Sequence, residues 1–133
     1  GAPAPDAQAP ALQRLLAEAP AARPDRIAIR IDGRVLLVRP ADIDWIEAAD
    51  DSVRFHVGRT VYEQRDTLSR LEQRLPAGQF LRIHRSTIVN VDRIRELQPW
   101  FQGDWVVILV DGTKLTTGRS YRPRLKALID GTA

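Results

Sequence analysis

The chain has 133 residues, of which 44% are hydrophobic, enough for one globular domain with a modest core. It contains no cysteine, which excludes a disulfide scaffold, a cysteine-ligated metal site and a cysteine nucleophile, and which fits a reducing, cytoplasmic compartment. The net charge of +3 is unevenly spread: residues 80–133 hold nine basic and five acidic residues, so the C-terminal part is the candidate surface for a polyanion.

The first 25 residues are rich in alanine and proline, which predicts a linker. Its prolines leave room for one short helix over residues 11–19, with Leu12, Leu15 and Leu16 on one side. A helix that docks on a partner or on a second copy of the chain is the alternative. The chain begins at Gly1 and has no methionine, which indicates a piece of a longer protein. No apolar run is long enough to span a membrane, so no membrane contact is expected.

From residue 26 onward the sequence has the period of two that is typical of β-strands. Ile27, Ile29 and Ile31 alternate with polar residues, and Asp32-Gly33 follows as a hairpin signal, because a type I′ turn needs positive φ at both central positions. The same combination of apolar runs and turn residues predicts further strands over residues 35–38, 43–47, 53–57, 60–65, 105–110 and 113–117.

Two short helices are expected among these strands. Thr67 can cap a helix over residues 68–75, which Pro76 and Gly78 end, and residues 121–129 form a closing helix. Many short strands with regular turns predict a mainly β fold, with short antiparallel strands in small packed sheets and two short helices. The folded domain is expected to span residues 26–130.

The most informative stretch is residues 80–90, which read Phe-Leu-Arg-Ile-His-Arg-Ser-Thr-Ile-Val-Asn. The pattern predicts a strand, a polar and basic break, and a second strand ending at Asn90, whose side chain is expected to cap or bridge backbone. A core strand rarely places His84, Arg85 and Ser86 in a row, whereas a loop that meets phosphates and base edges would. Arginine offers a rigid fork of donors that matches a guanine edge, and serine and histidine add adaptable hydrogen bonds.

The order of these features resembles the LytTR family of bacterial DNA-binding domains. The segments that carry the resemblance read Ile-Asp-Trp-Ile-Glu-Ala at 43–48, the stretch at 80–90, Leu-Val-Asp-Gly-Thr at 109–113, and Gly-Arg-Ser-Tyr at 118–121. The resemblance covers about residues 26–130. It implies a domain that binds duplex DNA by sequence, as the output domain of a transcription regulator that reads direct repeats in promoters with loops. It also implies a homodimer in the full-length protein and an upstream receiver or sensor domain.

The resemblance places three loops at the DNA, around Ser52, Arg85 and Arg119. The residues expected to contact bases are Arg85, Arg119, His84 and Ser52. The residues expected to contact phosphates are Arg82, Arg54, Ser86, Lys114 and Arg122, which would position the protein without reading sequence. This chain departs from the usual pattern of the family at two places. Residues 51–53 read Asp-Ser-Val where Asn-Tyr-Val is common, and Gly118 replaces a usual serine, so base preference is expected to differ.

Two other functions are compatible with the sequence. An OB-like binder of single-stranded nucleic acid would use Trp100 and Trp105 as stacking platforms. A regulatory module would bind protein through the helix that contains Leu12 and Leu16. Catalysis is not expected, because the acidic run at residues 42–51 lacks the spacing of a metal site and no glycine-framed nucleophile is present. No cofactor or metal is expected either.

Overall fold

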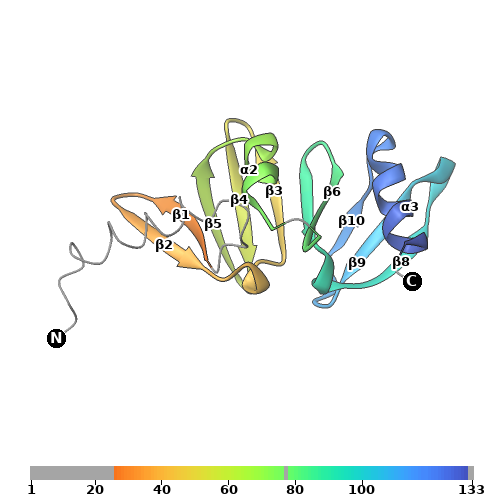
Figure 1. Cartoon of the computed structure of the whole chain (residues 1–133), viewed down its shortest axis with the longest axis horizontal. Helices are drawn as coiled ribbons and strands as arrows, with labels where there is room; N and C mark the ends of the chain where they lie inside the picture. The colour runs from red at the N-terminus through yellow and green to blue at the C-terminus, as the bar shows by residue number, and fades with distance from the viewer. Residues whose placement is uncertain (1–25, 77, 132–133) are drawn as a thin grey trace.

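The computed structural model describes residues 26–76 and 78–131. In these ranges the expected mainly β fold is confirmed, because ten strands form three antiparallel sheets and two α-helices accompany them. Figure 1 shows the three sheets in a row along the long axis of the molecule. The helix predicted over residues 11–19 lies outside the described residues.

The first sheet is a hairpin of β1 (Ile27–Ile31) and β2 (Arg34–Val38). The predicted turn lies between the strands, but Gly33 alone has a positive φ, of 71°. A type I′ turn would require positive φ at Asp32 as well, so that detail of the prediction was wrong. The buried side chains of β1 face the next sheet and join its core.

The second sheet has five strands in the order β5-β4-β3-β7-β6. The strands are β3 (Trp45–Ala49), β4 (Ser52–Val57), β5 (Thr60–Arg65), β6 (Phe80–His84) and β7 (Thr87–Asn90). The central strand starts two residues later than predicted, because Pro40–Asp42 forms a 3₁₀ turn that the Ile43 N–H closes on the Pro40 carbonyl. Asn90 is fully buried and bridges backbone as predicted: its amide donates to the Ile43 carbonyl at 2.8 Å, and its oxygen accepts from the Asp92 N–H at 3.0 Å.

The third sheet has the order β10-β9-β8, with β8 (Ile94–Pro99), β9 (Trp105–Leu109) and β10 (Lys114–Thr116). The helices are α2 (Leu68–Arg74) and α3 (Arg122–Asp130), close to the predicted ranges. The Thr67 hydroxyl caps α2 as expected, by accepting a hydrogen bond from the Arg70 N–H at 3.2 Å. In the described ranges neither helix is long and apolar enough to cross a membrane.

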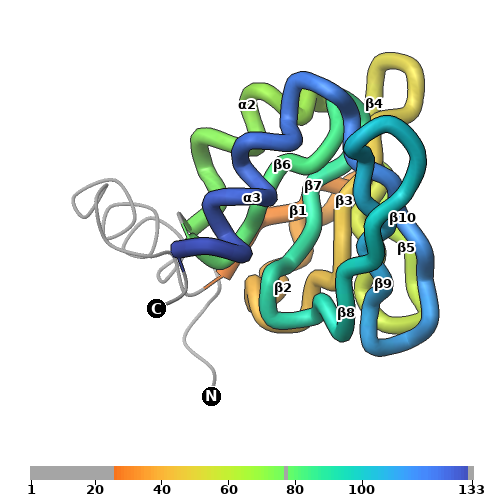
Figure 2. Tube along the Cα trace, turned by 90° about the vertical axis from the view of Figure 1, so that its right-hand side faces the viewer, coloured from red at the N-terminus to blue at the C-terminus, as the bar shows by residue number. Residues whose placement is uncertain are grey.

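The five-stranded sheet is covered on both faces. One core includes Ile29, Phe55 and Leu71 and lies between the first hairpin, this sheet and α2. The other includes Ile83, Val107 and Leu125 and joins β6 and β7 to the third sheet and α3. Ile88 and Val89 are consecutive in β7 and belong to different cores, because side chains of a strand alternate between its faces. Figure 2 shows that α2 and α3 lie on the same side of the molecule.

Candidate nucleic-acid interface

Three turns meet at one edge of the molecule, which we call the binding edge: the β3–β4 turn (residues 50–51), the β6–β7 turn (residues 85–86) and the segment before α3 (residues 117–121). Backbone hydrogen bonds join them. The Ala48 N–H donates to the Ser86 carbonyl at 2.9 Å, and the Gly118 N–H donates to the Ile83 carbonyl at 2.8 Å. Figure 1 shows the β3–β4 and β6–β7 turns at the upper edge, with the start of α3 at the same level. The structure therefore brings together the three loops that the sequence singled out.

Arg85 and Arg119 are the exposed arginines of this edge. Within the described ranges neither guanidinium makes a hydrogen bond or an ion pair. Most arginines nearby are bound to carboxylates, among them Arg54, Arg65 and Arg122. Two arginines with unoccupied donor forks, on turns joined by a backbone hydrogen bond, form a surface suited to guanine edges or phosphates.

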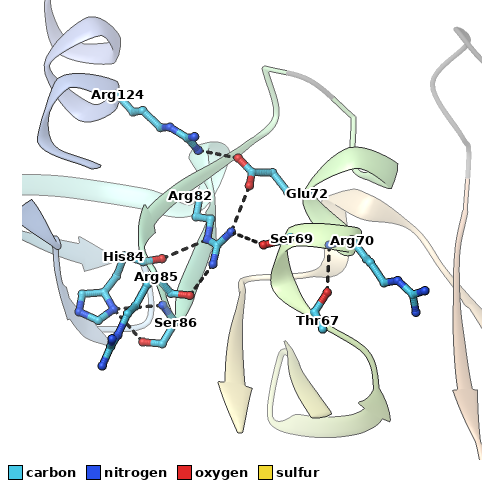
Figure 3. Close-up of polar contacts among 9 residues, drawn as sticks. All are labelled: Thr67, Ser69, Arg70, Glu72, Arg82, His84, Arg85, Ser86 and Arg124. Atoms are coloured by element: carbon cyan, nitrogen blue, oxygen red, sulfur yellow. Dashed lines mark hydrogen bonds and ion pairs between the residues drawn. The ribbon is translucent and has the colours of Figure 1, made fainter. Parts of the chain in front are cut away.

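His84 is held by the turn that it begins. Its Nδ1 accepts a hydrogen bond from the Ser86 N–H at 3.1 Å and lies 2.8 Å from the Ser86 hydroxyl (Figure 3). A backbone N–H can only donate, so Nδ1 is the acceptor and the neutral ring carries its proton on Nε2. His84 therefore offers an N–H donor at Nε2, while the Ser86 hydroxyl is engaged with the ring.

Because Gly118 has no side chain, the His84 ring can pack directly against its backbone. A Cβ atom at position 118 would lie 3.1 Å from the Cδ2 atom of His84, which is closer than ordinary van der Waals contact. The backbone there has φ of −90°, so the glycine is needed for close approach and not for an unusual conformation. The replacement of the family's usual serine thus matches the position of the His84 ring.

Ser52 is buried, with 5% of its surface exposed. Its hydroxyl lies 2.9 Å from both the Ala49 carbonyl and a carboxylate oxygen of Glu63. The hydrogen bond from Ser52, and then that from Arg54, lower the pKa of Glu63 below its ordinary value. Ser52 has little exposed surface for a base, and Arg54 donates to Glu63 at 3.1 Å across the sheet.

The turn before Ser52 is acidic and tightly bent. Asp50 has a positive φ of 54°, a conformation that aspartate tolerates better than most residues. Asp51 pairs with Arg65 of the neighbouring strand at 2.8 Å. This pairing offsets one of the two acidic charges that the turn brings to the binding edge.

The other residues expected at phosphates differ in their surroundings. Arg82 is turned inward, with 12% of its side chain exposed, and binds carbonyls of the β6–β7 turn (Figure 3). Arg122 pairs with Asp104 at 2.6 Å. Lys114 is exposed and unpaired in the described part of the chain, but it lies at the end of β10 that is farther from Gly118. None of the five is therefore placed like Arg85 and Arg119.

The two tryptophans considered as stacking platforms are in different environments. Trp100 is 55% exposed at the β8–β9 tip, next to Phe101, which is 72% exposed and meets it edge to face. Trp105 is half-buried against the second core, and its backbone N–H donates to the Thr117 hydroxyl. The exposed aromatic pair is Trp100 with Phe101, and the sequence reasoning missed Phe101.

Sequence reasoning also missed two residues behind the β6–β7 turn, Glu72 and Tyr121. Glu72 of α2 binds both Arg82 and Arg124 (Figure 3). The ring of Tyr121 lies against the guanidinium groups of the same two arginines. Glu72 and Arg124 are 52 positions apart in the chain. No local pattern could have paired them.

Comparison with known proteins places this geometry in a family. The LytTr DNA-binding domain family matches residues 33–130. The sensory transduction protein LytT of Bacillus anthracis is 36% identical over 104 residues, which cover 78% of this chain and 42% of that protein. LytT of Enterococcus faecalis is 38% identical over 102 residues, and the transcriptional regulatory protein LytR of Staphylococcus aureus is 35% identical over 103 residues; each match covers 77% of this chain and 42% of the relative.

Among solved structures, a LytTr DNA-binding domain from Bacillus cereus matches with a TM-score of 0.72 and 22% identity, over 80% of this chain and 97% of that one. This similarity shows the fold. The family match makes this arrangement of three small antiparallel sheets a DNA-binding domain of the β type. The chain belongs to the LytTR family, as the sequence indicated. It spans less than half the length of the curated relatives that it matches.

Proposed function

We propose that this chain is the DNA-binding output domain of a bacterial transcription regulator and reads duplex DNA by sequence through the binding edge. The observation that carries the proposal is the exposure of Arg85 and Arg119 on adjacent turns, with no partner for either guanidinium among residues 26–76 and 78–131. Each arginine can form two hydrogen bonds to a guanine in the major groove. One well-formed arginine–guanine contact with two hydrogen bonds contributes roughly 1–3 kcal/mol of discrimination against a wrong base.

The residues around these two arginines have supporting roles in this proposal. His84 donates from Nε2 to a base or a phosphate, because its other ring nitrogen is occupied by Ser86. Arg54, Arg122, Lys114 and Ser86 are proposed to contact phosphates, which fix the position of the domain on the duplex. Ser52 is proposed to act at the β3–β4 turn, where its hydrogen bonds shape the segment that approaches the DNA.

The full-length protein is proposed to be a cytoplasmic, non-enzymatic regulator. The curated relatives are named as sensory transduction and transcriptional regulatory proteins, and the matching segment is 42% of their length. This supports a further domain in the full-length protein. We propose that it is an upstream receiver or sensor domain, which pairs two copies of the chain on direct repeats in a promoter. The domain needs no cofactor in this scheme.

A binding titration tests the proposal. The chain is titrated with the promoter region upstream of its own gene and with a shuffled duplex of equal length, at two salt concentrations. Tighter binding to the promoter, lost in Arg119→Ala, is the expected result. Equal binding to both duplexes, with a log–log salt slope of roughly −0.9 per neutralised phosphate, would leave only generic attraction and contradict sequence reading.

Single-stranded nucleic acid is the second candidate ligand, because Trp100 and Phe101 are exposed together at the β8–β9 tip. Stacking of a base on a tryptophan quenches its fluorescence. Quenching by oligothymidine that disappears in Trp100→Phe, combined with weak duplex binding, would favour this function. A protein partner bound through residues 11–19 would instead change size-exclusion behaviour when residues 1–25 are removed.

A further inference from the structure

We propose that Arg82 is a positioning residue for base reading by Arg85, and that Glu72 of α2 holds Arg82 in place. The inference rests on the proposed function of the binding edge and assigns Arg82 a role other than phosphate contact. Arg82 and Glu72 touch no DNA in this scheme. They set the shape of the turn that presents Arg85.

The guanidinium of Arg82 spans the β6–β7 turn from behind (Figure 3). Its Nη2 donates to the Arg85 carbonyl at 2.6 Å, and its Nε donates to the His84 carbonyl at 3.4 Å. These two carbonyls belong to the peptide groups on both sides of the Arg85 N–Cα–C unit. Fixing both peptide planes fixes the direction in which the Arg85 side chain leaves the backbone.

The other side of the Arg82 guanidinium is bound to α2. Its Nη1 donates to the Ser69 hydroxyl at 3.1 Å and to a carboxylate oxygen of Glu72 at 3.4 Å. All three nitrogens are therefore engaged inside the protein, and 12% of the side chain is exposed. A phosphate would have to displace these partners, whereas the Arg85 guanidinium has no partner in the part of the chain that the structure describes.

Glu72 ties this arrangement to the second turn of the binding edge. Its other carboxylate oxygen accepts from Arg124 of α3 at 2.5 Å. Arg82 and Arg124 both lie over the ring of Tyr121, with their central carbons 5.5 and 5.0 Å from its centroid. Tyr121 ends the 3₁₀ turn that begins at Arg119. One carboxylate thus supports the segments that carry Arg85 and Arg119.

The consequence is preorganisation. A turn held in one shape before binding loses less conformational entropy when its side chain meets a base, and its arginine approaches the base edge at a defined angle. Generic attraction to phosphates needs no such angle. Loss of the support should therefore weaken specific binding and leave binding to unrelated DNA unchanged.

The experiment compares Arg82→Lys, Arg82→Gln and Glu72→Gln with the unaltered chain. The probes are a duplex selected from a random library by the unaltered chain and a shuffled duplex, each titrated at several salt concentrations. Lysine keeps the charge and can still contact a phosphate as a point charge, but it lacks the planar fork that bridges two carbonyls and a carboxylate. Glu96→Gln is the control, because it removes an exposed acid of β8 outside this network.

For Arg82→Lys we expect about tenfold weaker binding to the selected duplex, with unchanged binding and salt slope on the shuffled one. Glu72→Gln should also weaken binding to the selected duplex alone, although the loss of a negative charge by itself would strengthen binding to any DNA. Glu96→Gln should strengthen binding to both duplexes slightly or leave both unchanged. Full retention of specific binding in Arg82→Lys would overturn the proposal. A second result would also overturn it: in Arg82→Gln, the log–log salt slope of binding falls in magnitude by about 0.9 on both duplexes. That change indicates the loss of a phosphate contact.

Amide hydrogen exchange of the free chain separates this inference from the proposed function. We expect a peptide covering residues 84–87 to exchange faster in Arg82→Gln and Glu72→Gln than in Glu96→Gln, because the turn loses its support. Unchanged exchange would overturn the positioning role. Failure of the unaltered chain to select any sequence would instead refute base reading by the domain, whatever the exchange data show.

Discussion

At the scale of single residues, the binding edge is defined by which side chains are already bound within the protein. Arg82, Arg54 and Arg122 carry the same charge as Arg85, but their donors are committed to carbonyls or carboxylates. Arg85 and Arg119 have no such partner in the described ranges. Exposure and unoccupied donors, more than charge, separate the candidate base readers from the other arginines.

Replacement of Arg85 by alanine should remove sequence discrimination. We expect Arg85→Ala to lose roughly 1–3 kcal/mol of preference for a selected duplex, because its bidentate contact to a base is gone. Lys114→Ala is the matched control and should weaken all duplexes alike, if Lys114 contacts only phosphates. Competition titrations with selected and shuffled duplexes measure both effects. Equal losses on both duplexes for Arg85→Ala would contradict base reading.

Replacement of Gly118 by serine should disturb the His84 ring, because a Cβ atom would come within 3.1 Å of it. We expect Gly118→Ser to shift the ring resonances of His84 and to alter the duplex selected from a random library. Gly118→Ala should cause the same shift, since the cause is the Cβ atom. Unchanged ring resonances in both variants would mean that the added Cβ atom does not disturb His84, and would contradict the prediction.

At the scale of elements, hydrogen bonds between neighbouring segments hold the turns of the binding edge. The β6–β7 turn is joined to β3 through Ala48, and the end of β6 is joined to the segment before α3 through Gly118. The β3–β4 turn is supported by Ser52, which is bound to Glu63 of β5. A similar device stabilises the β9–β10 turn, where hydrogen bonds from the Thr113 N–H and hydroxyl lower the pKa of Asp111. These bonds give short strands defined ends.

Replacement of Ser52 by alanine should raise the pKa of Glu63, because the hydrogen bond from Ser52 is the largest cause of its lowered value. The lowered pKa in the folded state stabilises the protein above the ordinary pKa of 4.5, and this contribution is lost as the pH falls through the folded value. We expect Ser52→Ala to weaken this acid dependence and to lower the stability at neutral pH. NMR titration of Glu63 measures the pKa, and Arg54→Ala should raise it less.

At the scale of the whole molecule, β7 couples the two cores, because Ile88 belongs to one and Val89 to the other. The three sheets are therefore not independent units, although they follow one another along the long axis (Figure 1). The same strand begins directly after the β6–β7 turn, so the binding edge adjoins the strand that joins the two cores. This arrangement favours cooperative unfolding.

Truncation of Ile88 should destabilise both halves of the domain together. We expect Ile88→Ala to cost about 2–5 kcal/mol, as is usual for a large aliphatic side chain removed from a core. Denaturation followed by tryptophan fluorescence and by far-UV circular dichroism should give coincident transitions. Trp45 and Trp105 report on the second core, which does not contain Ile88. An unchanged fluorescence midpoint beside a lowered dichroism midpoint would show that the cores unfold separately.

The amino-acid sequence by itself determined the fold class, the order of the elements and the position of the basic turn at residues 84–86. These features depend on alternation, turn residues and helix caps, which act between near neighbours in the chain. Strand ends were predicted to within about two residues, apart from β8, where no strand was assigned. The tertiary structure decided which polar groups are bound within the protein: Ser52 is bound to Glu63, and Arg82 to the β6–β7 turn and α2. It also placed the His84 ring in the space beside Gly118. Such pairings join distant segments, and no local pattern encodes them.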